Sequence, residues 1–188
     1  KFLPKKRQTL LFSATIPAEI ADLAEKMLHE PEHISVTPSA KPADKIEQQL
    51  YFVEKQEKRE LLPDIIRQSN VHQVLVFTRT KHGADRVARD LNRAGIKTKS
   101  IHGDKSQNQR QRALADFKEC KIAVLVATDI AARGIDINDL PLVINFDLPN
   151  IPETYVHRIG RTGRAGQEGT AISFCDRSER PYLKDIEK

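Results

Sequence analysis

The chain has 188 residues, of which 39% are hydrophobic and 30% are charged, and its net charge is +5. This balance is typical of a soluble globular protein, and the positive charge permits a polyanionic partner. No apolar run reaches the length of about 18 residues that a membrane-spanning helix needs. The histidines are scattered without ligand spacing, so we expect no metal site.

The N-terminus and the cysteines predict a cytoplasmic protein. The basic stretch 1–7 is followed only by the short apolar run 10–12, which is not the pattern of a signal peptide. Cys120 and Cys175 lack metal-type spacing, and so few cysteines suit a reducing cytosol. Because the chain begins at Lys1 and not at Met, we expect it to be a segment of a longer protein.

The first part of the chain resembles the end of a domain. An apolar run over 8–15 predicts a buried strand, and apolar residues at helical spacing predict a helix over 16–28. Residues 33–37 alternate as in a strand. The next eight residues contain two prolines and no periodicity, which is typical of a linker. The expected parts are therefore the tail of one domain over 1–37, a linker over 38–45 and a second, complete domain over 46–188.

In the second domain, strand and helix patterns alternate. Pro63 lies inside one helix pattern, which predicts a kink or a late start of that helix. Gly95 stands where a helix end needs a left-handed residue, and Ser106 stands at a helix start. This alternation, with short connections, predicts an α/β domain with a parallel sheet. The expected strands cover 50–53, 74–77, 99–102, 122–127, 142–146 and 170–174, and the expected helices cover 57–68, 81–94, 106–119, 153–161 and 181 onward.

Distinctive side chains follow several of these strands. In a parallel sheet, ligands bind beyond the carboxyl ends of the strands, so these positions predict one functional edge. Each of Thr80, Asp104 and Asp129 could equally cap a helix, and only their combination favours a ligand site. The residues at the strand ends are Thr78-Arg79-Thr80, His102-Gly103-Asp104, and Thr128-Asp129 with Ala131 to Asp136 beyond.

The segment His157–Gly166 concentrates three arginines and three glycines. If the segment is helical from Glu153 onward, then Arg158, Arg161 and Arg164 lie on one face. A guanidinium group is a fixed positive charge that suits phosphate oxygens. The segment is therefore either an anion site or a solvated basic helix end.

The sequence lacks the groups that would complete a catalytic site. Gly103-Asp104-Lys105-Ser106 only partly matches a phosphate-binding loop, because Asp stands where that loop needs Lys. No paired carboxylates and no Ser/His/Asp arrangement stand out. What remains is a domain that donates positive charge to phosphates held elsewhere.

Five motifs in family order make the chain similar to the C-terminal RecA-like domain of DEAD-box RNA helicases, and most similar to the bacterial RhlE-type subgroup. The resemblance implies a RecA-like α/β fold, with a parallel sheet sandwiched between helices in three layers. Its motifs are Ser13-Ala14-Thr15 (motif III), Val76-Phe77 with Thr80 (motif IV), Gln107 with Arg110 (the Gln-x-x-Arg motif), Ala127–Asp136 (motif V) and His157–Arg164 (motif VI).

The resemblance implies a role for each of these residues. Arg161 and Arg164 would be arginine fingers at the ATP phosphates, and Asp136 and Gly134 would contact the ATP ribose. Arg158 would be structural. Sequence-independent RNA-backbone contacts would come from Arg110, Thr128, Thr80, Gly83 and Gly103. Coupling of nucleotide state to RNA state would come from His157, Ser13, Thr15 and Arg133.

The family's Walker A loop and Asp-Glu-Ala-Asp box are absent from this sequence. The resemblance therefore implies an ATP-dependent RNA helicase as the parent protein, in which ATP and Mg²⁺ are held mainly by an N-terminal RecA-like domain. The chain alone should be inactive. The alternatives are a DNA helicase or translocase of the same superfamily and a non-catalytic nucleic-acid-binding adaptor.

Overall fold

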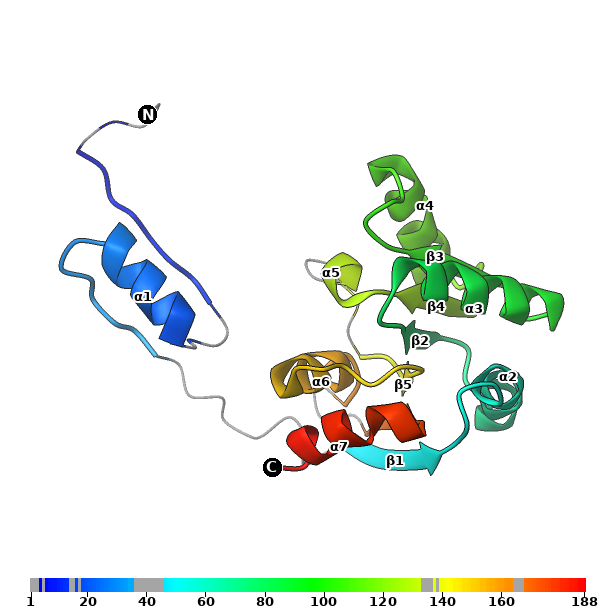
Figure 1. Cartoon of the computed structure of the whole chain (residues 1–188). Helices are drawn as coiled ribbons and strands as arrows, with labels where there is room; N and C mark the ends of the chain where they lie inside the picture. Colours follow the sequence, from blue (N-terminus) through cyan, green and yellow to red (C-terminus); the bar gives the residue numbers. More distant parts are fainter. Residues whose placement is uncertain are drawn as a thin grey trace. The chain divides into compact units, whose positions relative to one another are not determined.

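The computed structural model describes residues 6–13, 18–35, 46–132, 139–163 and 168–188, together with Pro4, Ile16 and Ile137. The chain divides into two compact units, Lys1–Ser39 and Ala40–Lys188, which are coloured along the chain in Figure 1. Each unit is described by itself. The expected linker, 38–45, lies outside the described residues.

The first unit contains one described helix, α1 (Ala18–Met27), which confirms the helical spacing. The expected strands are wrong for the described residues of 8–15 and 33–37, which form no strand. Phe12 is 89% exposed and Ile34 is 90% exposed. An apolar run forms a buried strand only when neighbouring strands accept its hydrogen bonds, and the described part of this unit supplies none.

The second unit is built on a six-stranded sheet with the order β1-β6-β5-β2-β4-β3. The neighbouring strands of this sheet are parallel, so their carboxyl ends meet at one edge. In Figure 1 the sheet runs from β1 at the bottom to β3 and β4 at the top. The strands are β1 (Ile46–Phe52), β2 (Val74–Phe77), β3 (Thr98–Ile101), β4 (Val124–Ala127), β5 (Leu142–Asn145) and β6 (Gly169–Cys175).

Helices cover both faces of this sheet, so the predicted three-layer arrangement is confirmed. One core cluster joins α2 and α3 to one face, and a second joins α4 and α5 to the other. Figure 1 shows α2 and α3 to the right of the strands, and α5 and α6 to the left. The helices are α2 (Lys58–Ser69), α3 (Lys81–Arg93), α4 (Gln107–Lys118), α5 (Asp129–Ala132), α6 (Pro152–Ile159), the short 3₁₀ helix η2 (Arg177–Glu179) and α7 (Arg180–Ile186).

The helix ends follow the local sequence. The Ser106 hydroxyl accepts a hydrogen bond from the Gln109 N–H, and the Gln109 side-chain oxygen accepts one from the Ser106 N–H, which closes a capping box. Gly95 takes a left-handed φ of 82° after α3, as predicted. Pro63 lies inside α2 and is buried, so α2 neither starts late nor ends there.

The predicted extension of the arginine helix to Arg161 is wrong, because α6 ends at Ile159. Beyond Gly160, Thr162 forms a parallel bridge with Leu140. The Thr162 hydroxyl donates to the Leu140 carbonyl, and the Leu140 N–H donates to the Arg161 carbonyl over 3.1 Å. The N–H groups of Arg161 and Thr162 form turn hydrogen bonds with the carbonyls of Arg158 and Ile159, so the α-helical pattern is not continued and Arg161 does not share a helix face with Arg158.

Gly169 allows β6 to pass close to this bridge. A Cβ atom at Gly169 would lie 1.9 Å from the Thr162 hydroxyl oxygen and 2.5 Å from the Gly163 nitrogen. We expect Gly169→Ala to lower the free energy of unfolding by about 1–3 kcal/mol, the usual cost of overpacking, measured by urea denaturation. Gly103→Ala is the control, because a Cβ there meets no atom within 4 Å. Equal stability of the two variants would contradict the prediction.

Candidate functional site

The carboxyl ends of β2, β4 and β3 bring the predicted RNA-contact residues to one edge. Thr80 follows β2, Gly103 follows β3 and Thr128 follows β4, and these three strands are neighbours. The Thr128 N–H donates to the Ile101 carbonyl over 3.3 Å, which ties the β4 end to the β3 end. Thr80 and Gly103 are exposed, whereas Thr128 is buried.

Thr80 and Gly83 form the start of α3. The Thr80 hydroxyl accepts a hydrogen bond from the Gly83 N–H over 3.0 Å, so the capping role considered for Thr80 is confirmed. A hydroxyl that accepts one bond still has a proton to donate. A Cβ at Gly83 would lie 3.0 Å from that hydroxyl oxygen, so this turn has little room for a larger side chain.

Arg110 contributes an unsatisfied buried donor to the same edge. One terminal nitrogen of its guanidinium group donates to the Ala131 carbonyl over 3.4 Å, which connects α4 with α5. Its buried Nε atom has no hydrogen-bond partner in the described part of the chain. Since a buried donor without a partner costs about 1–3 kcal/mol, an additional acceptor at this position is favourable.

Beneath Gly103, a charged cluster surrounds Asp85 of α3. The Asp85 carboxylate accepts from the Ser100 hydroxyl over 2.5 Å and lies 3.0 Å from the Lys105 ammonium and 3.1 Å from the His102 Nε2. Burial alone would raise the pKa of Asp85, but the hydrogen bond from Ser100 and the nearby Lys105 and His102 side chains outweigh burial and lower the pKa far below the ordinary value.

This cluster makes a prediction about acid stability. Since the pKa of Asp85 is lower in the folded chain than in the unfolded chain, its stabilisation is present above the unfolded pKa of about 3.9 and is lost as the pH falls through the folded value. We expect Asp85→Asn to flatten the fall of the free energy of unfolding below about pH 4, measured by urea denaturation at each pH. A parallel pair of curves would contradict this role.

The arginine segment divides into a structural and a more accessible part. Arg158 is 1% exposed, and its guanidinium group donates to both carboxylate oxygens of Asp129, over 2.6 and 2.8 Å. The predicted structural role of Arg158 is therefore confirmed, and Asp129 serves as its partner. His157 is exposed and Arg161 is half-buried.

Several predicted site residues are not placed by the structure. They are Arg164, Asp136, Gly134, Arg133 and Thr15, which lie outside the described residues. Ser13 of the first unit is described and exposed.

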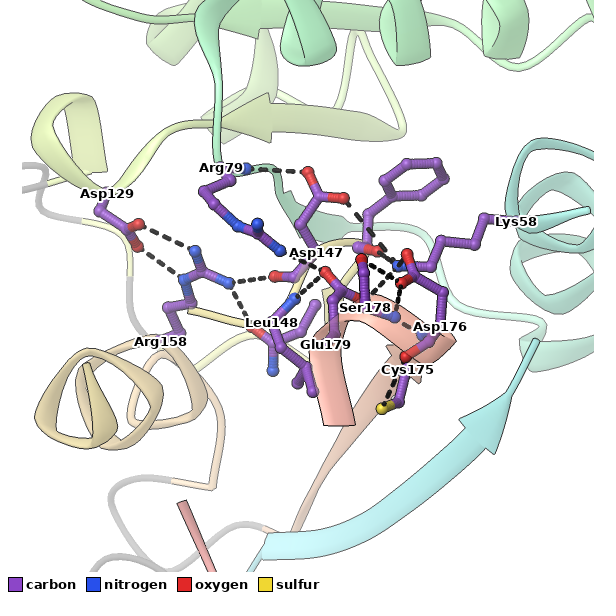
Figure 2. A network of polar contacts seen from close by, with 12 residues as sticks. Lys58, Arg79, Asp129, Asp147, Leu148, Arg158, Cys175, Asp176, Ser178 and Glu179 are labelled. Carbon is purple, nitrogen blue, oxygen red and sulfur yellow. Dashed lines mark hydrogen bonds and ion pairs between the residues drawn. The ribbon is translucent and has the colours of Figure 1, made fainter. Parts of the chain in front are cut away.

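A buried polar network on the same edge was missed by the sequence analysis. Lys58 of α2 is 1% exposed. Its ammonium lies 2.5 Å from Glu179 and 3.2 Å from Asp176, and donates to the Phe146 carbonyl over 3.1 Å. Figure 2 shows Lys58, Asp176 and Glu179 pointing toward one another from α2 and the segment after β6.

Arg79 extends this network to the end of β2. Its guanidinium donates to Glu179 over 2.5 Å, and its backbone N–H donates to Asp147 over 2.9 Å. The Leu148 N–H also donates to Glu179, over 3.1 Å. Glu179 thus joins the ends of β2, β5 and β6, as Figure 2 shows. The network fixes the strand ends from which the candidate site is built.

The described side chains do not form a complete catalytic centre. No group of three or more His, Cys, Asp and Glu side chains within the described ranges could hold a metal ion. None of the described helices is long and apolar enough to cross a membrane. The described edge carries guanidinium and hydroxyl groups, which suit phosphate oxygens.

A family model described as the helicase conserved C-terminal domain matches residues 57–166. This match covers β2 to α6 and thus the whole carboxyl edge between them. The chain belongs to the helicase conserved C-terminal domain family. Within the family it is a C-terminal domain of the DEAD-box type, as the relatives below indicate.

The ATP-dependent RNA helicase CshA of Listeria monocytogenes is 46% identical over 188 residues, which are 100% of this chain and 36% of that protein. The E. coli DEAD-box protein SrmB, solved bound to regulator of ribonuclease activity A, is 40% identical with a TM-score of 0.72, over 76% of this chain and 84% of that chain. The chain thus spans little more than a third of the length of CshA.

The helicase domain also matches a solved complex. S. cerevisiae Dbp5 bound to RNA and ADP BeF3 is 34% identical with a TM-score of 0.84, over 99% of this chain and 50% of that chain. The RecA-like fold implied by the resemblance is therefore confirmed. The RhlE-type subgroup stays a prediction.

Proposed function

We propose that this chain is the C-terminal half of an ATP-dependent DEAD-box RNA helicase and that its carboxyl edge binds the RNA backbone. The observation that carries this proposal is the partnerless buried Nε atom of Arg110. Arg110 belongs to the same edge as Thr80, Gly83, Gly103 and Thr128. The similar Dbp5 structure was solved with RNA, which supports RNA as the polyanion.

In this proposal the edge binds RNA by its phosphates. Arg110 and the hydroxyl of Thr128 contact phosphate oxygens, and Thr80 and Gly103 donate hydroxyl or backbone hydrogen bonds. Gly83 contributes through the turn that its N–H forms with the Thr80 hydroxyl. Phosphate contacts fix the position of a strand without reading its sequence. Binding is therefore expected to be independent of sequence and to weaken as the salt concentration rises.

The nucleotide site is proposed to lie between this domain and an N-terminal RecA-like domain. The guanidinium groups of Arg161 and Arg164 fit phosphate oxygens, and Asp136 offers a carboxylate to the ribose hydroxyls, beside Gly134. Mg²⁺ neutralises phosphate charge in such reactions and is assigned to the N-terminal domain. His157, Arg133, Ser13 and Thr15 are assigned to the coupling of the two domains.

The proposed mechanism is local strand separation in the cytoplasm. With ATP and single-stranded RNA bound, the two domains close and hold one RNA strand in a bent form. A bent strand cannot remain paired with its complement. Arg161 and Arg164 stabilise charge that develops on the phosphate during hydrolysis, after which the domains separate.

The test is an ATPase assay of this chain alone, of the N-terminal RecA-like domain alone, and of both together, with RNA or DNA added. We expect turnover only when both domains are present, and stimulation by RNA but not by DNA. ATP turnover by this chain alone would overturn the proposed division of labour. Stimulation by DNA alone would identify a DNA helicase, and no turnover in the mixture would favour an adaptor.

A further inference from the structure

A groove of about 680 Å³ opens at the carboxyl edge between α2 and α3. It lies over the ends of β2, β5 and β6. Its volume falls in the range of pockets that hold small ligands, about 300–1,000 Å³. The groove is lined by residues after β1 (Lys55 and Gln56), by the N-terminal turns of α2 and α3 (including Arg86), and by Ser178.

The groove is positively charged. Five Lys and Arg side chains line it, against the carboxylates of Asp147, Asp176 and Glu179. Lys55 and Arg86 are exposed, and neither forms a hydrogen bond or ion pair with another described residue. Their positive charges are therefore available to an anion.

The carboxylates of the groove are neutralised from within the fold. Asp176 and Glu179 are buried and lie 3.2 and 2.5 Å from the Lys58 ammonium. Arg79 adds a second cation at 2.5 Å from Glu179. Because these charges are already paired, they oppose an incoming phosphate less than free carboxylates would.

The groove is continuous with the proposed RNA surface, because Thr80 and Gly83 line it as well. We propose that it binds the RNA backbone that continues past these two residues, with Lys55 and Arg86 as phosphate ligands. This inference rests on the proposed function and extends the proposed RNA-binding surface into the groove. An acidic peptide is the competing occupant, but the shared Thr80–Gly83 turn favours RNA.

The first experiment is a titration of the isotopically labelled chain with an oligouridylate of about 12 nucleotides, followed by backbone amide NMR. We expect shifts at Gly83 and Gly103, which report the proposed RNA surface, and at Lys55, Gln56 and Ser178, which report the groove. Shifts at the two glycines alone would overturn the groove and leave the proposed function intact. Absence of shifts at the glycines would instead contradict the proposed RNA surface.

The second experiment compares the salt dependence of RNA affinity. If Lys55 and Arg86 each bind one phosphate, the double variant Lys55→Gln/Arg86→Gln should reduce the slope of log K against log salt by about 1.4, or about 0.7 for each contact on a single strand. Arg93→Gln is the control on the same helix, since Arg93 is 77% exposed and pairs with Asp90. An unchanged slope in the double variant would overturn the proposal.

A titration with a polyglutamate peptide tests whether the groove binds an acidic peptide instead of RNA. We expect the peptide to leave the amide signals of Lys55, Gln56 and Ser178 unshifted at the concentration at which the oligouridylate saturates the chain. Equal shifts with polyglutamate would assign the groove to acidic peptides and overturn the proposed extension of the RNA-binding surface.

Discussion

Arg164→Ala in the full-length protein is expected, from the proposed role of Arg164, to reduce ATP turnover by about 10³-fold or more, the contribution of an arginine finger in phosphoryl transfer. The affinity for ATP should change far less, because the finger interacts more strongly with the charge of the transition state than with bound ATP. The measurement is RNA-stimulated ATP hydrolysis, with ATP affinity measured separately. Equal losses of turnover and affinity would mean that Arg164 only binds nucleotide.

The neighbouring arginine provides a matched control for this variant. Arg158 is 1% exposed and forms a two-point ion pair with Asp129. Removing one member of a buried pair costs about 3–5 kcal/mol, so Arg158→Ala should lower the free energy of unfolding. Urea denaturation of Arg164→Ala is measured beside it. Loss of stability in both variants would show that low turnover reflects unfolding and not a missing finger.

The sheet was predictable because its strands are short, apolar and separated by strong helix signals. The run at 74–77 matches β2 at both ends, and the runs at 122–127 and 142–146 contain β4 and β5. A continuous apolar run indicates a strand covered on both faces, which is the environment found for all three. Ser106 and Gly95 set helix ends through local hydrogen bonds and backbone conformation, so they too could be predicted.

The errors occur where a segment depends on distant partners. Residues 8–13 have strand-like composition, but Leu10 is 66% exposed because composition alone does not supply a neighbouring strand. Likewise, α6 ends early because Thr162 pairs with Leu140, 22 residues away in sequence. Neither the lack of a neighbouring strand at 8–13 nor the pairing of Thr162 with Leu140 leaves a local signal in the sequence.

The buried network was only partly visible in the sequence. Arg79 and Asp147 lie just after strands, so the strand-end argument that selected Thr80 could also have selected them. Lys58 and Glu179 gave no such signal, because they occur in helical segments where a charged residue usually faces solvent. Their burial results from the packing of α2 and η2 across the ends of the strands.

Lys58→Met is expected to lower the free energy of unfolding by about 3–5 kcal/mol, the cost of leaving a buried charge without its partner. Methionine preserves most of the apolar stem, which packs near Phe146 with the ammonium 5.8 Å from the ring centre. The loss of stability should therefore come from the carboxylates that lose their cation and not from lost packing. Without Lys58, the carboxylates of Glu179, 1% exposed, and Asp176, 6% exposed, lose a shared cation. The measurement is urea denaturation at neutral pH.

Two further variants separate charge from packing. Glu179→Gln keeps one side-chain oxygen as an acceptor, for the N–H of either Leu148 or Asp176, and removes one negative charge. In the Lys58→Met background it should restore part of the lost stability, as a coupling of about 0.5–3 kcal/mol between neighbours in contact. Lys121→Met is the control, since Lys121 lies the same 2.5 Å from Glu119 but is 64% exposed. A small loss of stability from Lys121→Met and a large loss from Lys58→Met would show that burial, and not distance, gives the Lys58 ion pairs their effect. Additive losses in the double variant would contradict that conclusion.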